Sequence, residues 1–441
     1  MSQRSLLILA LLLAGCTPKT FTEKAEYPPI FPDYTGVTIP DGIAPINFEL
    51  ENGEKFVVEK KICSDTIWYK VKSWKKGERT GTSYKAFPIY ISHDPIDPYI
   101  AYRLIEPGYE SWHNMGIYQR ELSSFREKAI VTNRVNSLGC VNCHSFCNRN
   151  ADRMLFHARG KGGGTVIVKN GEASLTDLAK TEAAMQGTYP AWHPGGRYVA
   201  FSSNTTQQCF SINHEQPIEV YDTASDIMIL DTDTGKTFTS PFLKTEDKLE
   251  TFPGWSEDGK TLYYCRADNI RDVCSGRGDI HYLLEAIDFE DGEFRGEPRI
   301  IYGSDSSSVS FPRVCGRYLM FTESGFGTFP IWHKEADLKL LDTESGRLLP
   351  AEIINSGDTE SYHSWSGNGK WVIFSSRRDD GRYTRLYIAH FDGNGVFGKP
   401  FMLPQRRPSH NRIRLKSYNI PEFVSSPVDI RQSEFKKLFQ K

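Results

Sequence analysis

Three segments of the chain repeat one pattern of apolar and turn-forming positions. Each has a Trp, a Gly a few residues later, then Lys or Arg and a run of aromatic and β-branched residues. Gly readily adopts the left-handed backbone of a tight turn, and the following run is typical of a β-strand. The pattern therefore predicts repeated strand–turn–strand units. The three copies span residues 189–202, 252–264 and 363–375, and a degenerate fourth copy spans 311–322.

The spacing of these copies fits a β-propeller. Trp192 and Trp255 are 63 residues apart, Val314 follows after 59, and Trp365 after a further 51, which is room for one four-stranded blade and a loop each time. One more blade is expected ahead of them, because residues 153–157 align with 197–202 less one residue. The predicted fold class is all-β, with about five to six blades, the last completed by flanking segments.

The remaining segments give the predicted domain boundaries. Short apolar runs at 46–50, 56–58, 67–71 and 88–91 read as strands of a small β-domain over 34–115. Residues 116–133 have mixed periodicity that allows a helix. We assign 116–150 to a short cofactor-binding segment, 151–415 to the propeller and 416–441 to a C-terminal tail.

The N-terminus has the pattern of an export signal. Arg4 precedes a continuous apolar run of nine residues, 6–14, which is too short to span a bilayer. The sequence Leu13-Ala14-Gly15-Cys16 then matches the lipobox of bacterial lipoproteins. We predict a signal peptide over 1–15, lipidation of Cys16 and a tether over 16–33; a plain signal peptide with a chance cysteine is the alternative. Several acyl chains hold a protein stably at a membrane, so we expect a periplasm-facing, lipid-anchored protein of the cell envelope.

Composition narrows the chemistry. The 441 residues carry 53 basic and 55 acidic side chains, a formal net charge of −2, which does not favour a nucleic-acid partner. Nine cysteines are present, and eight remain as thiols once Cys16 carries the predicted lipid. In an exported protein these suit disulfides or thioether-bound cofactors. Cys265 and Cys274, nine residues apart, are one candidate pair.

A C-x-x-C-H motif carries the most specific chemical prediction. In Cys140-Val141-Asn142-Cys143-His144 the two cysteines are spaced to form thioethers with haem vinyl groups, and the histidine is placed to ligate the iron. The predicted cofactor is covalently bound haem c. Three alternatives remain: a Cys140–Cys143 disulfide, a zinc site that includes Cys147 and a histidine, or a disulfide of Cys147 with another cysteine.

The sixth iron ligand has several candidates. His157 stands where the other repeats have Ser202, Thr322 and Ser375, and we favour it, so that His144 and His157 would be the metal ligands. A histidine hydrogen-bonded inside a strand is the competing interpretation. Met154 aligns with tyrosines of the other repeats and is expected to pack in the core. The further candidates are His113 and Met115.

The repeats resemble the TolB-type, WD-like propeller repeat over about residues 150–405. With the lipobox, the segment 102–110 and the Cys-x-x-Cys-His-Ser-Phe motif, the chain resembles a family of bacterial TolB-like propeller lipoproteins with one cytochrome c-type motif. The resemblance implies an architecture and a haem, not a reaction.

Three functions follow as hypotheses. The first is electron transfer or redox sensing by a membrane-anchored haem protein, with the propeller as a platform for an envelope protein or redox partner. The second is a non-catalytic envelope binding module whose cysteines are structural. The third is a haem enzyme resembling a peroxidase. Neither a Gly-x-Ser-x-Gly nor a His-Glu-x-x-His motif supports common hydrolase chemistry, and whether the protein is an enzyme stays open.

Overall fold

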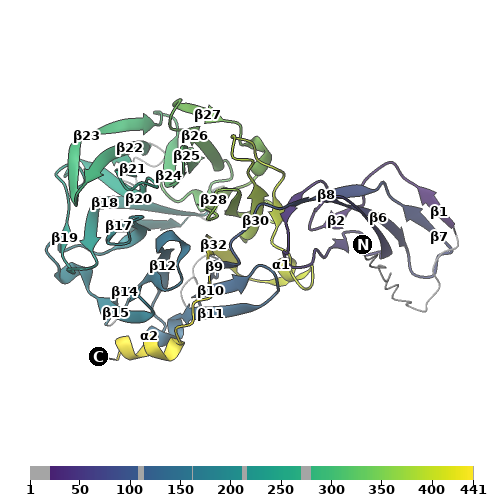
Figure 1. The fold of residues 1–441 in the computed structure, drawn as a ribbon, viewed down its shortest axis with the longest axis horizontal. Coiled ribbons are helices and arrows are strands. Elements are labelled where there is room, and N and C mark those ends of the chain that lie inside the picture. The colour runs from purple at the N-terminus through teal and green to yellow at the C-terminus, as the bar shows by residue number, and fades with distance from the viewer. Residues whose placement is uncertain (1–19, 108–113, 161, 211–215, 270–279, 441) are drawn as a thin grey trace, which may run out of the picture. The chain divides into compact units, whose positions relative to one another are not determined.

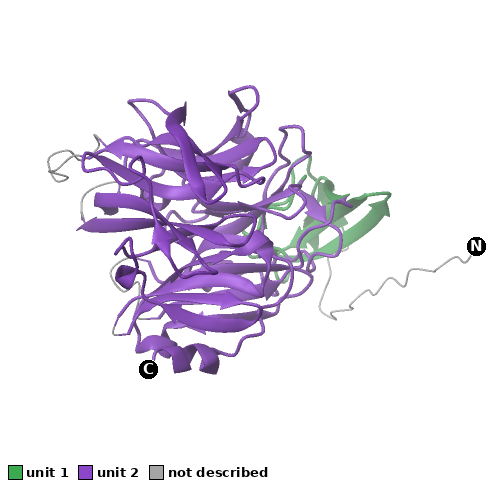
Figure 2. Ribbon diagram, turned by 60° about the vertical axis from the view of Figure 1, so that its left-hand side comes forward, with its two compact units in different colours: residues 1–36, 48–91 green, residues 37–47, 92–441 purple. Residues whose placement is uncertain are grey.

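The structure is a computed structural model that describes residues 20–107, 114–160, 162–210, 216–269 and 280–440. It is nearly all-β and divides into two compact units, which Figure 2 colours separately. The smaller unit comprises Met1–Gly36 and Phe48–Ile91, and the larger one Val37–Asn47 and Ser92–Lys441. The small β-domain expected over 34–115 is therefore shorter at its C-terminal end. Cys16 lies outside the described residues, and no described helix is long and apolar enough to cross a membrane.

The smaller unit is built around one long strand, β6, with which β5, β7 and β8 all pair antiparallel, while β1 pairs parallel with β7. Its core includes Tyr69 and Phe87, whose rings stack 5.4 Å apart. All four strands expected here are present. The strands are β1 (Thr20–Glu23), β2 (Ile30–Phe31), β4 (Glu49–Leu50), β5 (Lys55–Cys63), β6 (Thr66–Trp74), β7 (Thr80–Ser83) and β8 (Phe87–Ser92).

The larger unit contains six four-stranded antiparallel sheets among its described residues, and its fold is β-propeller-like (Figure 1). We name each sheet by its first strand. The β12 sheet has β12 (Val141–Phe146), β13 (Arg153–Ala158), β14 (Gly164–Lys169) and β15 (Glu172–Thr176). The β16 sheet has β16 (Thr188–Trp192), β17 (Tyr198–Phe210), β18 (Ile218–Asp231) and β19 (Thr237–Phe238). The β20 sheet has β20 (Lys248–Trp255), β21 (Thr261–Asp268), β22 (Leu283–Glu290) and β23 (Glu293–Tyr302).

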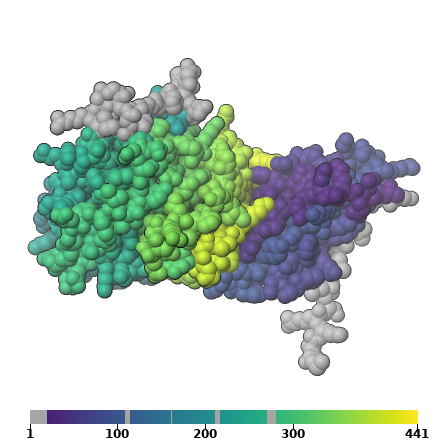
Figure 3. Space-filling view, turned by 90° about the horizontal axis from the view of Figure 1, so that it is seen from above, coloured from purple at the N-terminus to yellow at the C-terminus, as the bar shows by residue number. Residues whose placement is uncertain are grey.

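The next two sheets follow the same order. The β24 sheet has β24 (Ser308–Cys315), β25 (Tyr318–Ser324), β26 (Asp337–Asp342) and β27 (Arg347–Leu349). The β28 sheet has β28 (Glu360–Trp365), β29 (Trp371–Ser376), β30 (Arg385–His390) and β31 (Phe401–Met402). This unit also contains β3 (Thr38–Pro40) and α1 (His410–Ile413). The surface colour of the larger unit changes gradually through teal and green in Figure 3, as expected when consecutive sheets pack side by side.

The sixth sheet joins two ends of the chain. Its first strand, β32 (Ser417–Val424), pairs with β9 (Tyr99–Ile105), which pairs in turn with β10 (Gly116–Glu121) and β11 (Glu127–Thr132). Two expectations differ from this arrangement. Residues 116–133 form strands where a helix was allowed, and residues 416–441, expected as a tail, contain β32 and the helix α2 (Gln432–Leu438).

The repeated tryptophans link neighbouring sheets. Each ends the first strand of its sheet and pairs across to the second strand, as Trp192 does with Val199. Its indole Nε1–H donates to a backbone carbonyl on the first strand of the preceding sheet. The three bonds are Trp192 to Ser145 (3.3 Å), Trp255 to Ala191 (3.1 Å) and Trp365 to Arg313 (3.2 Å). The repeat therefore encodes a contact between sheets as well as a turn.

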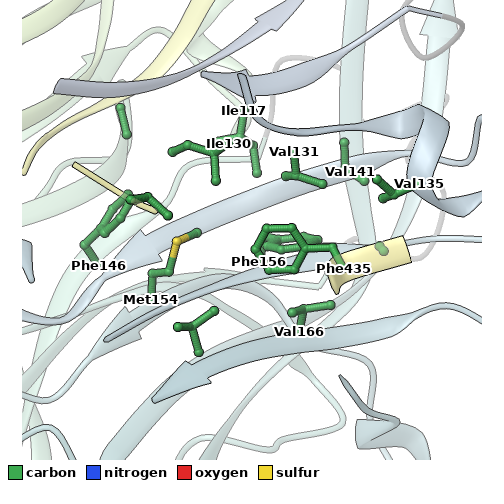
Figure 4. Close-up of a cluster of buried hydrophobic side chains, with 14 of the residues drawn as sticks. Ile117, Ile130, Val131, Val135, Val141, Phe146, Met154, Phe156, Val166 and Phe435 are labelled. Atoms are coloured by element: carbon green, nitrogen blue, oxygen red, sulfur yellow. The ribbon is translucent and has the colours of Figure 1, made fainter. Parts of the chain in front are cut away.

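Apolar side chains fill the interface between the β32 and β12 sheets (Figure 4). Ile117 from β10 and Met154 from β13 are completely or almost completely buried in this cluster. The C-terminal helix α2 covers it, because Phe435 is buried and meets the ring of Phe156 edge-on at 5.2 Å. Strand β12, which carries the C-x-x-C-H motif, therefore contributes side chains to this buried cluster.

Candidate functional site: a cavity along the first strands

Every first strand contains a β-bulge at an equivalent position. The bulged residue has a left-handed backbone, which is uncommon for residues other than glycine. Its φ angle is 51° at Cys143, 45° at Tyr189, 51° at Phe252, 55° at Phe311, 41° at Tyr362 and 53° at Ile420. The residue that follows is Pro or His in all six strands. The Cys143-His144 pair is thus also one copy of a structural repeat.

Four of these bulged residues form an aromatic layer. Ring centroids are 4.5 Å apart for Tyr189 and Phe252, 4.2 Å for Phe252 and Phe311, and 4.9 Å for Phe311 and Tyr362. Tyr189 and Phe311 also meet, at 6.0 Å, although the β20 sheet lies between theirs in chain order. The rings therefore meet across the space that the six first strands surround.

A cavity of about 600 Å³ lies against this layer and is lined by residues from all six first strands. Its volume is within the range of small-molecule and cofactor sites. Four of its lining residues have ionisable side chains that are of interest for chemistry. They are His144 on β12, Arg313 on β24, His363 on β28 and Glu422 on β32.

The side chain of His144 is completely buried, and neither ring nitrogen has a hydrogen-bond partner among the described residues. Its Nε2 is 3.8 Å from Oε1 of Glu422. The pKa of His144 is lowered to about 3, mainly by burial and also by the positive charge of Arg103, while an interaction with the backbone of Ile420 opposes both. The imidazole is therefore neutral at physiological pH, and a neutral imidazole is the form that ligates metals.

Glu422 and Arg313 bring two further ionisable groups to the cavity. Burial raises the pKa of Glu422 to about 7. Two interactions oppose this rise: its Oε2 accepts a hydrogen bond from the backbone N–H of Phe146 at 3.1 Å, and Arg313 contributes a positive charge. Burial also lowers the pKa of Arg313, and the charge of Glu422 opposes this. The cavity wall thus has an acid that titrates near neutrality.

His363 is the counterpart of His144 in the β28 sheet. Its Nε2 is 3.0 Å from the carbonyl oxygen of Met320, and its Nδ1 has no partner. Burial lowers its pKa to about 3 as well. Within the described part of the chain, the two histidines therefore differ in that His363 has one hydrogen-bonded ring nitrogen and His144 has none.

The motif cysteines lie at different depths. Cys143 lines the cavity and is 7% exposed, whereas Cys140 is half-buried just before β12 and outside the lining. Burial raises the pKa of both thiols, and the charge of buried Arg103 opposes this rise. Arg103 donates to Oδ1 of Asn142, which also accepts the backbone N–H of Cys143 at 2.7 Å. Among the described residues, Cys63, Cys140, Cys143, Cys147, Cys265 and Cys315 form no disulfide with one another, and Cys274 lies outside the described residues.

The candidates for a sixth ligand do not meet His144 in this cavity. His157 pairs with Asn142 in the sheet, but its Nδ1 is 3.2 Å from Oγ1 of Thr165 and it does not line the cavity. Burial lowers its pKa to about 4. Met154 packs in the core as expected (Figure 4), and so does Met115. His113 lies outside the described residues.

The motif residues fit a haem c in part. His144 offers an unpartnered neutral imidazole, and Cys143 lines the same cavity, whereas Cys140 lies outside the lining. For zinc, no group of three or more His, Cys, Asp or Glu side chains in the described part of the chain could hold a metal ion.

His363, Arg313 and Glu422 were missed by reading the sequence. A signal was present, because Cys143-His144-Ser145-Phe146 aligns with Tyr362-His363-Ser364-Trp365. The first segment matches a cofactor motif and the second matches the propeller repeat, and this difference hides their equivalence in the sequence. Glu422 follows Ile420-Pro421 in the same alignment, but in a segment expected to be a tail.

A long hairpin reaches over from the β16 sheet to the β24 sheet. Strands β17 and β18 have 13 and 14 residues, and we call their outer part, 204–210 and 218–224, the arm. On the arm, Glu219 is fully buried and its Oε2 is 2.7 Å from Nε2 of His333. The other ring nitrogen of His333 is 2.9 Å from Oε1 of Glu335. Tyr282, before β22, donates to Asp222 of the arm at 3.4 Å.

No family model matches the chain, and no curated protein matches it. Three similar solved structures are an oligogalacturonate lyase in complex with manganese, the tricorn protease and a Mycobacterium tuberculosis puromycin-hydrolyzing peptidase. Their TM-scores are 0.40, 0.40 and 0.39, at 9%, 12% and 11% identity, and they cover 69%, 80% and 84% of this chain. The matches span 73%, 36% and 57% of those proteins. At this level of similarity we infer neither a family nor an activity from them.

Proposed function

We propose that the protein is a c-type haem protein of the cell envelope that carries electrons or senses redox state. The observation that carries the proposal is the completely buried His144, whose two ring nitrogens have no partner in the wall of a cavity that Cys143 also lines. An unsatisfied buried polar group costs about 1–3 kcal/mol, so this imidazole is expected to have a ligand in the functional protein.

The proposed architecture is a TolB-type propeller in which each of the six four-stranded sheets is one blade. Three features support it: the first strands surround one cavity, the tryptophans link successive sheets, and β32 pairs with β9 to join the two ends of the chain. An N-terminal lipid on Cys16 would hold the propeller at the periplasmic face of a membrane. The outer surface of the propeller would then be available to an envelope protein or redox partner.

The roles of individual residues follow from their surroundings. Cys140 and Cys143 would attach the haem, and His144 would be its protein ligand through the lone pair of its unprotonated ring nitrogen. When bound, haem supplies one-electron chemistry at its iron. Glu422, beside His144 and with a pKa near 7, is expected to hold or release a proton at its carboxylate when the charge of the site changes. His157, which the sequence favours as the sixth ligand, does not line the cavity, whereas His363 does, so we propose His363 for that position.

The test is production of the full chain in a host that matures haem c. We expect a Soret band and haem staining that survives denaturing electrophoresis. Replacing both Cys140 and Cys143 with Ala should abolish the stain. Cys147→Ala is the matched control, because Cys147 is also buried on this segment but is not among the residues that line the cavity. Colourless protein in which Cys140 and Cys143 react as free thiols or form a disulfide would refute the proposal.

The same material tests the axial ligands. His144→Ala should shift the spectrum of the stained protein towards high spin. His363→Ala should do so in the ferric state if it supplies the sixth ligand, and His157→Ala should leave the spectrum unchanged. A response to His157→Ala alone would return the assignment to the residue that the sequence favoured.

A non-catalytic binding module is the second candidate. It is favoured by the structural repeat. Cys143 occupies the bulge position that an aromatic residue or isoleucine occupies in the other five first strands, and His144 occupies the following position, where those strands have Pro or His. In that case the cavity would take a small molecule without covalent attachment, and the first experiment would give colourless protein.

A further inference from the structure

A second cavity, of about 380 Å³, lies at the opposite end of the sheets from the one that His144 lines. Its lining includes Thr359, just before β28, and Arg377, just after β29, whereas the first cavity is lined by residues at the other end of β28, such as Trp365. Trp332 and Tyr383 supply aromatic walls. This site is independent of the proposed haem.

Arg377 is a buried cation with no carboxylate partner among the described residues. It is 4% exposed, its Nε has no hydrogen-bond partner among the described residues, and its Nη1 makes a long contact of 3.5 Å with the carbonyl of Gly381. A buried charge is stable only when it is paired, and the described residues supply no ion pair for this guanidinium, so a bound anion is a suitable counter-ion for it.

The two carboxylates that act on Arg377 through space both accept backbone hydrogen bonds. Asp380 accepts the backbone N–H groups of Arg382 and Tyr383 at 2.8 Å each through its Oδ1. Asp358 accepts the backbone N–H of Thr359 at 2.8 Å. Both acids influence Arg377 through space, and neither forms an ion pair with it within the described part of the chain.

The geometry of Arg377 suits an oxyanion. Its guanidinium lies 3.4 Å above the ring of Trp332, a stacking arrangement that leaves the edge of the fork available for two parallel hydrogen bonds. Lys334 and Arg382 also line the cavity, so three cations face one acid, Asp358. Trp332, Tyr383 and two prolines, Pro107 and Pro217, form the apolar part of the wall.

We propose that this cavity binds a ligand with a carboxylate or phosphate group on an apolar body, with the oxyanion held by Arg377. The apolar part of the ligand would pack against Trp332 and Tyr383. Lys334 and Arg382, which are exposed, would add attraction for the anion that weakens with salt.

Calorimetric titration of the full-length protein tests the site. The probes are inorganic phosphate, phenyl phosphate and benzoate. We expect the two probes with a ring to bind more tightly than inorganic phosphate, and comparison of phenyl phosphate with benzoate identifies the preferred oxyanion. Arg377→Met should weaken binding at least about tenfold, because hydrogen bonds to a charged group contribute about 1.5–3 kcal/mol each.

Controls separate binding from folding. Arg377→Met should not lower the thermal midpoint in the absence of anion, because it removes an unpaired buried charge. Arg347→Met, on exposed β27, should leave binding unchanged. If the Arg377 variant does not fold, the exposed pair Lys334→Met and Arg382→Met should still weaken binding about threefold. Absence of binding by all three probes, or equal binding by Arg377→Met, would overturn the proposal.

Discussion

The buried ion pair between Glu219 of the arm and His333 should make the stability of the protein depend on pH in a definite direction. His333 has a side chain with no solvent exposure, and its two ring nitrogens face Glu219 and Glu335. Burial lowers the pKa of His333, but the hydrogen bonds to the two carboxylates outweigh it and raise the pKa to about 9 from an ordinary 6.5. His333 is therefore an imidazolium at neutral pH, and its proton holds the arm against the β24 sheet.

The magnitude follows from linkage. A pKa raised from 6.5 to about 9 corresponds to about 3 kcal/mol of stability. Because the folded-state value is the higher one, this stability is fully present below about pH 6.5 and is lost as the pH rises to about 9. His333→Gln cannot bind the proton and leaves Glu219 buried without a cation. We expect it to be less stable than wild type by up to about 3 kcal/mol at pH 6, with little difference at pH 9.5.

Two measurements check this expectation. Nuclear magnetic resonance of the histidine rings should show His333 protonated at both nitrogens at pH 7.5. Urea unfolding at pH 6, 7.5 and 9.5 should show a stability difference between wild type and His333→Gln that decreases with pH. Glu335→Gln is the graded control, because Glu335 is 50% exposed and solvent screens its contribution. A His333 that titrates at 6.5 or below, or a difference independent of pH, would refute the reasoning.

Three further predictions concern the larger unit. Trp255→Phe keeps an aromatic ring but removes the indole donor to the carbonyl of Ala191, and should cost about 1–2 kcal/mol, measured by thermal unfolding. Phe252→Ala opens the aromatic layer and should cost about 3–5 kcal/mol in urea unfolding. Burial raises the pKa of Glu422 from 4.5 to about 7, so wild-type stability is lost as the pH rises through that interval. Glu422→Gln, which still accepts the N–H of Phe146, should stabilise the protein at pH 8 by up to about 3 kcal/mol; equal stability at that pH would contradict the raised pKa.

The repeats could be predicted because their signals are local. A Trp, a turn glycine and a strand lie within fourteen residues, and the structure places them in equivalent registers, with Trp192, Trp255 and Trp365 opposite Val199, Leu262 and Val372. The alignment of His157 with Ser202 is also confirmed. His157 pairs with Asn142 and Ser202 pairs with Thr188, and each partner is the residue just before the bulge of its first strand. What could not be found locally is the sixth sheet, in which Asn419 pairs with Arg103 over more than three hundred residues.

Burial on both faces explains why the sequence of residues 116–133 allowed a helix where the structure has strands. Strand β10 lies between β9 and β11 and is buried on both sides, with Ile117, Gln119 and Arg120 all buried. A strand that is buried on both faces does not show the alternation of apolar and polar residues by which strands are recognised. The same local view assigned the C-x-x-C-H motif to a separate segment, because its repeat character is visible only after the first strands are superimposed.

The position of His144 in that repeat leads to a physical argument about the cavity. Four of the six first strands place Pro after the bulge, at residues 190, 253, 312 and 421, and Pro brings no polar hydrogen into a buried wall. A histidine there must bury two ring nitrogens, which is costly unless they are bonded. His363 recovers part of this cost through the carbonyl of Met320, whereas neither ring nitrogen of His144 has a hydrogen bond to the described residues. In addition, the bulged residue before His144 is Cys143, whereas the other five are aromatic or isoleucine. The smallest side chain of the set and the imidazole without a partner are therefore neighbours on one strand, and a ligand bound there would both occupy the space and satisfy the nitrogen.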